Sequence, residues 1–207
     1  MKDLASYLFA TPWPGLIVWS IFYISDYYMT LACARLYQNG GVREKILFEG
    51  SYEITPYFQR DIDGLRRISL RFLGALAYTW VVLGLTWWFS RQSTAELYQA
   101  LLGAMVCVQL AVHVRHFRNL FLFRAITQSD AVQGQIRYSR VTVLQMSAVE
   151  LFAFAGVFLC VFLVTHSWFV FGGAVSCAVT GSKHRAMVRK ALSPAPAAAQ
   201  TSPVAQS

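Results

Sequence analysis

Five long apolar stretches, separated by short polar segments, dominate the pattern of the chain. They cover residues 14–37, 69–89, 95–116, 141–165 and 167–182. A helix needs roughly 20 mostly apolar residues to cross the hydrocarbon of a bilayer, and the first four stretches meet that length. The fifth is shorter and follows the fourth almost directly. The pattern predicts an all-α, polytopic membrane bundle of five transmembrane helices.

The polar segment after the first stretch contains a second helical pattern. Thr55 and Pro56 are typical of a helix start, as N-cap and first helical residue. Apolar residues then recur at helical spacing with arginines and an aspartate between them, at Phe58, Ile62, Leu65, Ile68 and Phe72. This pattern predicts a cytoplasmic amphipathic helix that lies along the inner interface and leads into the second span. The run from residue 117 to 124 prolongs the third helix or lies on the membrane surface.

One domain followed by a tail is expected. Residues 1–190 form a single membrane-embedded helical domain. The last residues, 191–207, are rich in Ala, Pro, Ser and Gln, which cannot build a core. They are therefore expected to form a disordered cytoplasmic tail.

The distribution of basic residues predicts the orientation. Of 18 Lys and Arg residues, 16 lie on one side of the predicted membrane, and only Lys2 and Arg91 lie on the other. Because cytoplasmic loops carry the excess of Lys and Arg, the N-terminus is predicted outside and the C-terminus inside. Joining the last two stretches into one span would place the basic cluster at 183–190 on the opposite side. We expect the cell membrane, in a bacterium the inner membrane.

Composition narrows the candidate chemistry. Only 14% of the 207 residues are charged, against about 25% in soluble domains. The net charge of +8 belongs to loops beside apolar spans, which indicates anionic lipid rather than nucleic acid as the partner. All four cysteines lie in apolar stretches without C-x-x-C spacing, so neither a disulfide framework nor a zinc ribbon is expected. No nucleotide or serine-nucleophile motif is present, and the sequence leaves the identity of any cofactor unknown.

Polar residues inside the apolar stretches are the candidate site. An acid at bilayer depth costs roughly 2.5–3.5 kcal/mol, so it should face protein or water. With a helical rise of about 1.5 Å per residue, Asp26 lies about 16 Å above the cytoplasmic end of its span, Gln109 about 12 Å and Glu150 about 14 Å. His113 lies lower, at about 6 Å, and Thr30 is one turn below Asp26. We predict that these five residues form a substrate- or ion-binding site open to the cytoplasm.

Two further residues, Glu53 and His116, are candidates for a site at the inner interface. His113 and His116 are spaced as two ligands of a metal ion would be on one helix. However, there is no H-E-x-x-H motif, and no metal site is predicted. The competing interpretation is that the buried acids only fix helix packing through Gln, Tyr or His partners. Glu53 has a simpler role available as an acid before a helix N-terminus.

One pattern resembles a known family. Asp26-x-x-x-Thr30 in the first span is followed, after two glycines, by Glu53-x-x-Pro56. This is similar to an uncharacterised family of small prokaryotic multi-pass membrane proteins, which carry D-x-x-x-T and then an acidic E-x-N-P. The match covers residues 20–60, and Thr55 replaces the usual asparagine. The resemblance implies no activity, but it implies a role for Asp26, Thr30, Glu53 and Pro56.

Three functions remain open at this stage. The first is proton- or cation-linked transport or binding, in which Asp26 and Glu150 bind the ion. The second is a membrane-embedded enzyme that modifies a lipid or isoprenoid at the inner leaflet. The third is an accessory or assembly subunit without chemistry. Membrane lipid is an expected partner in each case, and a homo-oligomer or a larger membrane complex would help five helices to enclose a polar path.

Overall fold

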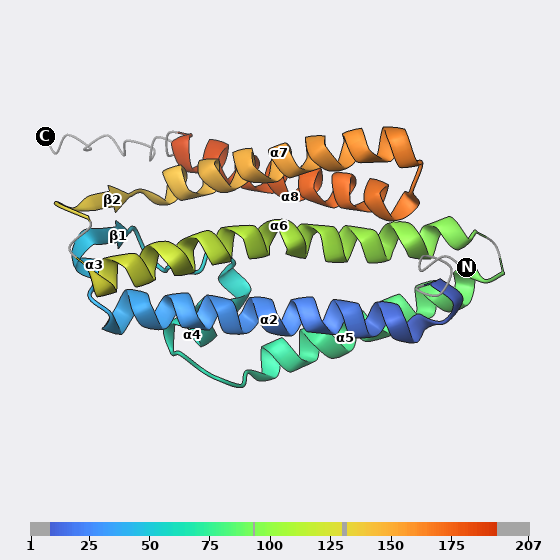
Figure 1. Ribbon diagram of the computed structural model, residues 1–207, viewed down its shortest axis with the longest axis horizontal. Helices are drawn as coiled ribbons and strands as arrows, with labels where there is room; N and C mark the ends of the chain where they lie inside the picture. Colours follow the sequence, from blue (N-terminus) through green and yellow to red (C-terminus); the bar gives the residue numbers. More distant parts are fainter. Residues whose placement is uncertain (1–8, 93, 130–131, 194–207) are drawn as a thin grey trace, which may run out of the picture.

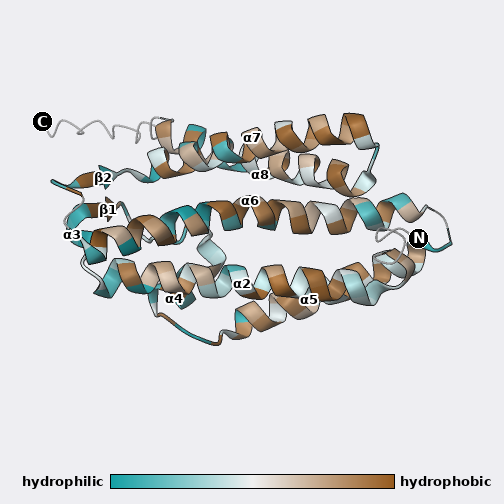
Figure 2. Cartoon of the chain, in the orientation of Figure 1, coloured by the Kyte–Doolittle hydropathy of each residue, from teal (hydrophilic) through white to brown (hydrophobic). Residues whose placement is uncertain are grey.

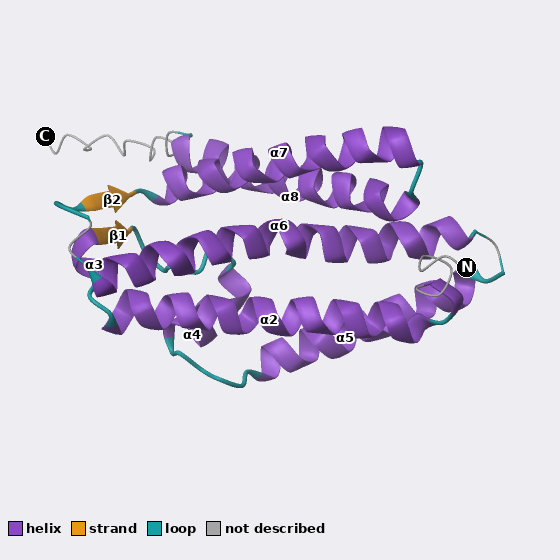
Figure 3. Ribbon diagram, in the orientation of Figure 1, coloured by secondary structure: helices purple, strands orange, loops and turns teal. Residues whose placement is uncertain are grey.

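Long helices account for most of the computed structural model, which describes residues 9–92, 94–129 and 132–193. The long helices are α2 (Pro12–Asn39), α5 (Leu70–Ser90), α6 (Ala95–Gln128), α7 (Arg140–Thr165) and α8 (Trp168–Leu192). The shorter elements are α3 (Val42–Lys45), α4 (Pro56–Asp63), β1 (Ile46–Phe48) and β2 (Ile136–Tyr138). The chain is therefore a helical bundle, with two short strands at one end (Figure 3).

Four helices within the described residues are long and apolar enough to cross a membrane: α2, α5, α6 and α7. Figure 2 shows apolar residues along most of these helices, with hydrophilic residues gathered mainly toward helix ends and in α3. This composition identifies a multi-pass membrane protein. The fifth apolar stretch forms the first part of α8, whose second part is basic.

Helix α6 lies between two layers, one made by α2 and α5 and the other by α7 and α8 (Figure 1). Glycines allow α8 to approach closely. A Cβ added to Gly172 would overlap the backbone carbonyl of Ala100, and one added to Gly103 would overlap that of Phe169. Small residues at such crossings are the usual means of close helix packing in membranes. By contrast, α7 packs along α8 and contacts α6 only sparsely.

The predicted continuous amphipathic helix is wrong in one respect. Helix α4 begins at Pro56 as expected but ends at Asp63, and Leu65 adopts a left-handed backbone with φ of 49°. Helix α5 starts afresh after Ser69, whose hydroxyl accepts hydrogen bonds from two backbone amides of the first turn. The same hydroxyl donates to the buried carboxylate of Asp61 at 2.6 Å. A side-chain cap and a turn therefore interrupt the apolar spacing.

The segments after α2 and before α7 contain a parallel two-stranded pairing that the sequence pattern did not indicate. Strand β1 pairs with β2 in the register Ile46↔Ile136, which ties the segment after α2 to the segment before α7. Helix α6 continues through residues 117–124 to Gln128. Of the predicted tail, residues 191 and 192 end α8, and the part from 194 onward lies outside the described residues.

Candidate functional site

A cavity of about 560 Å³ lies between α2, α6 and α7, with the segment from β1 to α4 forming another wall. Aromatic and aliphatic side chains make up much of its lining, among them Tyr23, Tyr27, Phe58 and Phe72. Its ionisable acidic and basic lining residues are Asp26, Glu53, Arg115, His116, Arg118, Glu150 and His184. The cavity thus combines apolar walls with a small number of charged groups.

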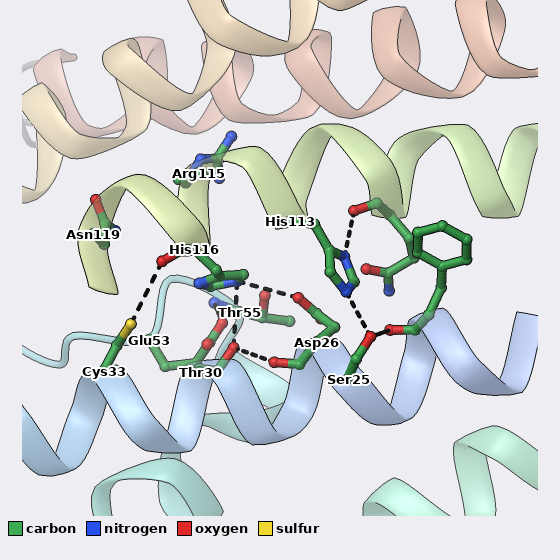
Figure 4. A network of polar contacts seen from close by, with 12 residues as sticks. Ser25, Asp26, Thr30, Cys33, Glu53, Thr55, His113, Arg115, His116 and Asn119 are labelled. Carbon is green, nitrogen blue, oxygen red and sulfur yellow. Dashed lines mark hydrogen bonds and ion pairs between the residues drawn. The ribbon is translucent and has the colours of Figure 1, made fainter. Parts of the chain in front are cut away.

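The first group of contacts joins α2 to α6 through His116 (Figure 4). The imidazole Nε2 lies 3.2 Å from Asp26 Oδ1, at ion-pair distance, and 3.3 Å from Thr30 Oγ1. Asp26 and Thr30 are four residues apart and therefore share one face of α2. The Thr30 hydroxyl donates to the Asp26 backbone carbonyl at 2.9 Å, so its oxygen is left to accept from His116.

This arrangement orients the imidazole. Nε2 faces the carboxylate and the hydroxyl of α2, whereas Nδ1 of the same ring is buried and has no hydrogen-bond partner. Buried polar atoms in proteins are nearly always paired, so an unpaired ring nitrogen needs an explanation. Asp26 Oδ1 also lacks a well-aligned hydrogen bond, although it lies within ion-pair distance of the ring. The cluster therefore contains one ring nitrogen and one carboxylate oxygen that form no hydrogen bond with the described residues.

Glu53 reaches the same cluster from the segment between β1 and α4. One of its carboxylate oxygens accepts from the backbone amide of Thr55 at 2.7 Å, and its backbone carbonyl accepts from Gln59 at 2.8 Å. Burial raises the pKa of the Glu53 carboxyl, against the lowering effect of the Thr55 amide and of nearby His116. Glu53 therefore takes up a proton more readily than an exposed glutamate.

The second group of contacts lies on the opposite wall, between α6 and α7. Arg115 Nε donates to Glu150 at 2.6 Å, and Arg118 donates to the other carboxylate oxygen at 3.4 Å. The Arg115 and Glu150 side chains are only 13% and 17% exposed, so this ion pair is largely shielded from water. Nη2 of Arg115 is buried and has no hydrogen-bond partner. Glu150 therefore meets two arginines across the gap between α6 and α7.

The structure gathers most of the predicted site residues around one cavity. Asp26, Thr30, Gln109 and Glu150 line it, and so do both interface candidates, Glu53 and His116. The residues quoted for the family resemblance, apart from Pro56, therefore meet at His116. Gln109 contributes a side-chain oxygen that is buried and unpaired.

His113 is placed differently from the prediction. It is absent from the cavity lining, and its Nε2 lies 2.6 Å from Ser25 Oγ. Its Nδ1 lies 2.7 Å from the Gln109 carbonyl, and its ring meets Phe22 edge-on at 5.3 Å. His113 is thus enclosed by packing and hydrogen bonds between α2 and α6, and His116 occupies the position beside Asp26.

Sequence reasoning missed several lining residues. Arg115 and Arg118 were counted as topology signals and, among the loop arginines, as possible phosphate ligands in the enzyme alternative, but not as the partners that a buried Glu150 required. Ser147 on α7 and His184 on α8 form a further contact on the cavity wall, with the hydroxyl 2.8 Å from Nδ1. Ser147 and His184 lie 37 residues apart, and no local spacing links them.

No set of three His, Cys, Asp or Glu residues in the described part of the chain is arranged to hold a metal ion. Comparison with protein-family models, curated proteins and solved structures gave no match. The class of protein is therefore defined by the fold and the site alone. It is a multi-pass membrane helical bundle with an internal, partly charged cavity.

Proposed function

We propose that this chain is a five-span protein of the cell membrane, and that its cavity binds an amphipathic ligand with exchange of a proton at the Asp26–His116 pair. The N-terminus lies outside, the C-terminus inside, and the cavity serves the cytoplasmic side. The observation that carries the proposal is a large, mostly apolar cavity containing a buried carboxylate–imidazole pair with an unpaired ring nitrogen.

Helix α8 supports the fifth span. Its 25 residues correspond to about 37 Å of helix, of which the apolar part, residues 168–182, makes up about 22 Å against a hydrocarbon thickness of roughly 30 Å. It runs antiparallel to α7 after a tight turn, and its basic end lies at the same end of the bundle as the C-terminus of α2 and the two strands (Figure 1). This arrangement brings the basic residues at 183–190 to the same side as those of the other two basic loops.

The size and lining of the cavity support an amphipathic ligand. Small-molecule sites usually measure about 300–1,000 Å³ and combine apolar walls with a few polar groups. At about 560 Å³, the cavity falls inside this range and carries its charges on two opposite walls. A bare cation is a poorer fit, because Glu150 already faces two arginines and Asp26 faces His116.

Proton exchange follows from the type of side chain that faces Asp26. Imidazole is the side chain that gains and loses a proton near neutral pH, and its charge would change the attraction between His116 and Asp26. A ligand that approaches Nδ1 would meet a donor when the ring is protonated and an acceptor when it is neutral. Binding and protonation are therefore coupled in this proposal.

A second candidate function is an enzyme that modifies a lipid or isoprenoid. A carboxylate that holds one imidazole nitrogen and leaves the other free is the arrangement used by general bases. The specific observation in its favour is the unpaired Nδ1 of His116. Turnover of a bound amphiphile by the wild type, and its loss in His116→Gln at unchanged binding, would distinguish this candidate from binding alone.

Native mass spectrometry of the protein purified in mild detergent tests the proposal. Val112 lines the cavity, whereas Val114 on the same helix is 46% exposed and lies outside the lining. We expect the wild type and Val114→Trp to retain a bound amphiphile and Val112→Trp to lose it. Asp26→Asn should bind with an altered dependence on pH. Equal retention by both tryptophan variants would refute the proposal and would favour an accessory subunit.

A further inference from the structure

We infer that the charged site lies at the level of the inner-leaflet head groups and that the cavity takes the phosphate-bearing head of an anionic membrane lipid. Arg115 and Arg118 are the phosphate ligands. This inference rests on the proposed function and specifies its ligand. Three observations support it: the helix lengths, the contacts that place the helices at the same depth, and the unpaired guanidinium donors of the cavity wall.

The length of helix α5 matches the thickness of the hydrocarbon layer. Its 21 residues correspond to about 31 Å, which matches a hydrocarbon thickness of roughly 30 Å. No charged residue occurs between Arg71 and Arg91, and the inner end begins at the Ser69 cap beside Arg66 and Arg67. The first turn of α5 therefore marks the inner boundary of the hydrocarbon.

Contacts between α5 and α2 show which residues of α2 lie at the depth of the first turn of α5. The Tyr27 hydroxyl donates to the backbone carbonyl of Arg66 at 2.8 Å, and the Tyr23 ring stacks on Phe72 with centroids 5.0 Å apart. Tyr23 and Tyr27 flank Asp26 on α2. Asp26 consequently lies near the first turn of α5, and the rest of α2 down to Asn39 extends beyond the hydrocarbon beside α4.

Helix α6 gives the same boundary independently. The 3.2 Å contact between Asp26 and His116 places both side chains at one level. From Ala95 to His116 the helix rises about 32 Å, again one hydrocarbon thickness. Below that point α6 carries Arg118, Asn119 and Arg124. The depth of about 16 Å counted from the end of the apolar stretch is too large, because α2 continues past the boundary.

The unpaired buried atoms at this level include both acceptors and donors. Glu150 faces two arginines, Asp26 faces His116 and Glu53 accepts from the Thr55 amide, while Asp26 Oδ1 and Gln109 Oε1 accept no hydrogen bond from the described residues. On the basic side, Nη2 of Arg115 is buried without a partner, and Arg118 keeps its side chain 55% exposed. Guanidinium groups bind phosphate oxygens through paired N–H donors, so phosphate is the group that these free donors fit best.

The apolar lining distinguishes a lipid from free phosphate. Tyr23, Phe58 and Phe72 cover one wall, and Val143 and Met146 of α7 face the cavity on another. These side chains would contact the glycerol and upper acyl region of a lipid whose phosphate lies at Arg115. A free anion would leave this apolar surface without a partner. The occupant is therefore a lipid taken from the inner leaflet.

The binding test titrates the detergent-purified full-length protein with three probes: phosphatidylglycerol, phosphatidylcholine and inorganic phosphate. We expect saturable one-to-one binding of phosphatidylglycerol only. Arg115→Gln and Arg118→Gln should each weaken it about tenfold or more, the usual loss for a hydrogen bond to a charged group. Arg124→Gln is the matched control, because Arg124 lies on the same helix, exposed and outside the lining.

Several results would overturn the inference. If phosphatidylcholine binds as well as phosphatidylglycerol, the site does not require an anionic head group. If inorganic phosphate binds equally well, the site does not require a lipid. If Val112→Trp abolishes binding while neither arginine variant weakens it, the proposed cavity function stands and the head-group assignment fails. If Arg115→Gln does not fold, Arg118→Gln still tests the head-group assignment. The Arg118 side chain is half exposed, so its replacement should not prevent folding.

The depth is tested separately with a membrane-impermeant maleimide in inside-out vesicles. In a Cys160→Ser background, which removes the exposed native thiol, single cysteines replace Leu110 and Phe121 of α6, which are 43% and 68% exposed. We expect rapid labelling at position 121, about 7 Å below His116, and none at 110, about 9 Å above it. An unreactive cysteine at 121 would place the site deeper and refute the inference.

Discussion

A double-mutant cycle on Arg115 and Glu150 tests whether their ion pair stabilises the packing of α7 against α6 on the two sides of the cavity. Helix α7 contacts α6 only sparsely, so this pair is a main direct link between the two walls. The perturbations are Arg115→Gln, Glu150→Gln and the double variant. Each glutamine keeps a similar length and removes one charge.

The expected magnitude follows from the burial of the two side chains. Removing one partner of a fully buried pair costs about 3–5 kcal/mol, because the other charge is stranded. Here the two side chains are 13% and 17% exposed, and Glu150 keeps a second arginine 3.4 Å away. We therefore expect a loss of about 2 kcal/mol in the free energy of unfolding for each single variant and a coupling energy of about 1–2 kcal/mol.

Equilibrium unfolding in mixed micelles, followed by tryptophan fluorescence, measures the four free energies of the cycle. The double variant should be more stable than the sum of the two single losses predicts, because no unpaired charge remains. A coupling energy below about 0.5 kcal/mol would refute the reasoning. It would mean that the charges of Arg115 and Glu150 do not stabilise each other across the gap, and that α7 does not face α6 through this pair.

Three further predictions concern the supporting structure. Burial raises the pKa of the Glu53 carboxyl in the folded protein. The stability that Glu53 contributes is therefore complete below its unfolded pKa of about 4.3 and is lost as the pH rises through its folded pKa. Glu53→Gln should flatten the pH profile of thermal unfolding between these two pKa values. Gly172→Ala should destabilise by about 1–3 kcal/mol through backbone overlap with α6, whereas Gly156→Ala, which faces open space, should not. Ser69→Ala should cost about 1–2 kcal/mol in chemical unfolding, by removing the α5 cap and a partner of buried Asp61; an unchanged midpoint would contradict this role.

The helices were predictable from the sequence wherever the spacing of apolar residues matches a helix that really is continuous. Apolar runs located all five long helices, because a span must satisfy its own backbone hydrogen bonds. The same reasoning failed between residues 64 and 69. Apolar spacing continues there through Leu65 and Ile68, although the helix has ended. The helix ends in a local turn, with Gly64 as the C-cap and Leu65 in a left-handed backbone, and the Ser69 hydroxyl then bonds the Asp61 carboxylate. Apolar periodicity records neither the turn nor this hydrogen bond.

Several residues of the cavity lining were predictable from the sequence, but their pairing was not. Asp26 was identified because an acid at bilayer depth needs a partner, Thr30 because it lies one turn below Asp26, and Glu53 through the family resemblance. His113 and His116 are three residues apart, so both fit the same stripe, and only the rotation of α6 against α2 decides which one meets Asp26. Arg115, one position earlier, points toward α7 for the same reason. Helix rotation is set by side-chain packing over the whole interface, which spacing within one helix does not contain.

The unequal helix lengths explain why a charged site can exist in this bundle at low cost. A carboxylate at the bilayer centre costs roughly 2.5–3.5 kcal/mol, and this penalty falls toward the interface. Because α5 is 21 residues long and α6 is 34, the longer helix extends beyond the shorter one at the end of the bundle that carries the two strands. The segment from β1 to α4 packs against these extensions and encloses the cavity there. In the lipid-binding proposal, Asp26, Glu53 and Glu150 lie at the level of the head groups, and the apolar walls of the same cavity face the acyl chains of the leaflet.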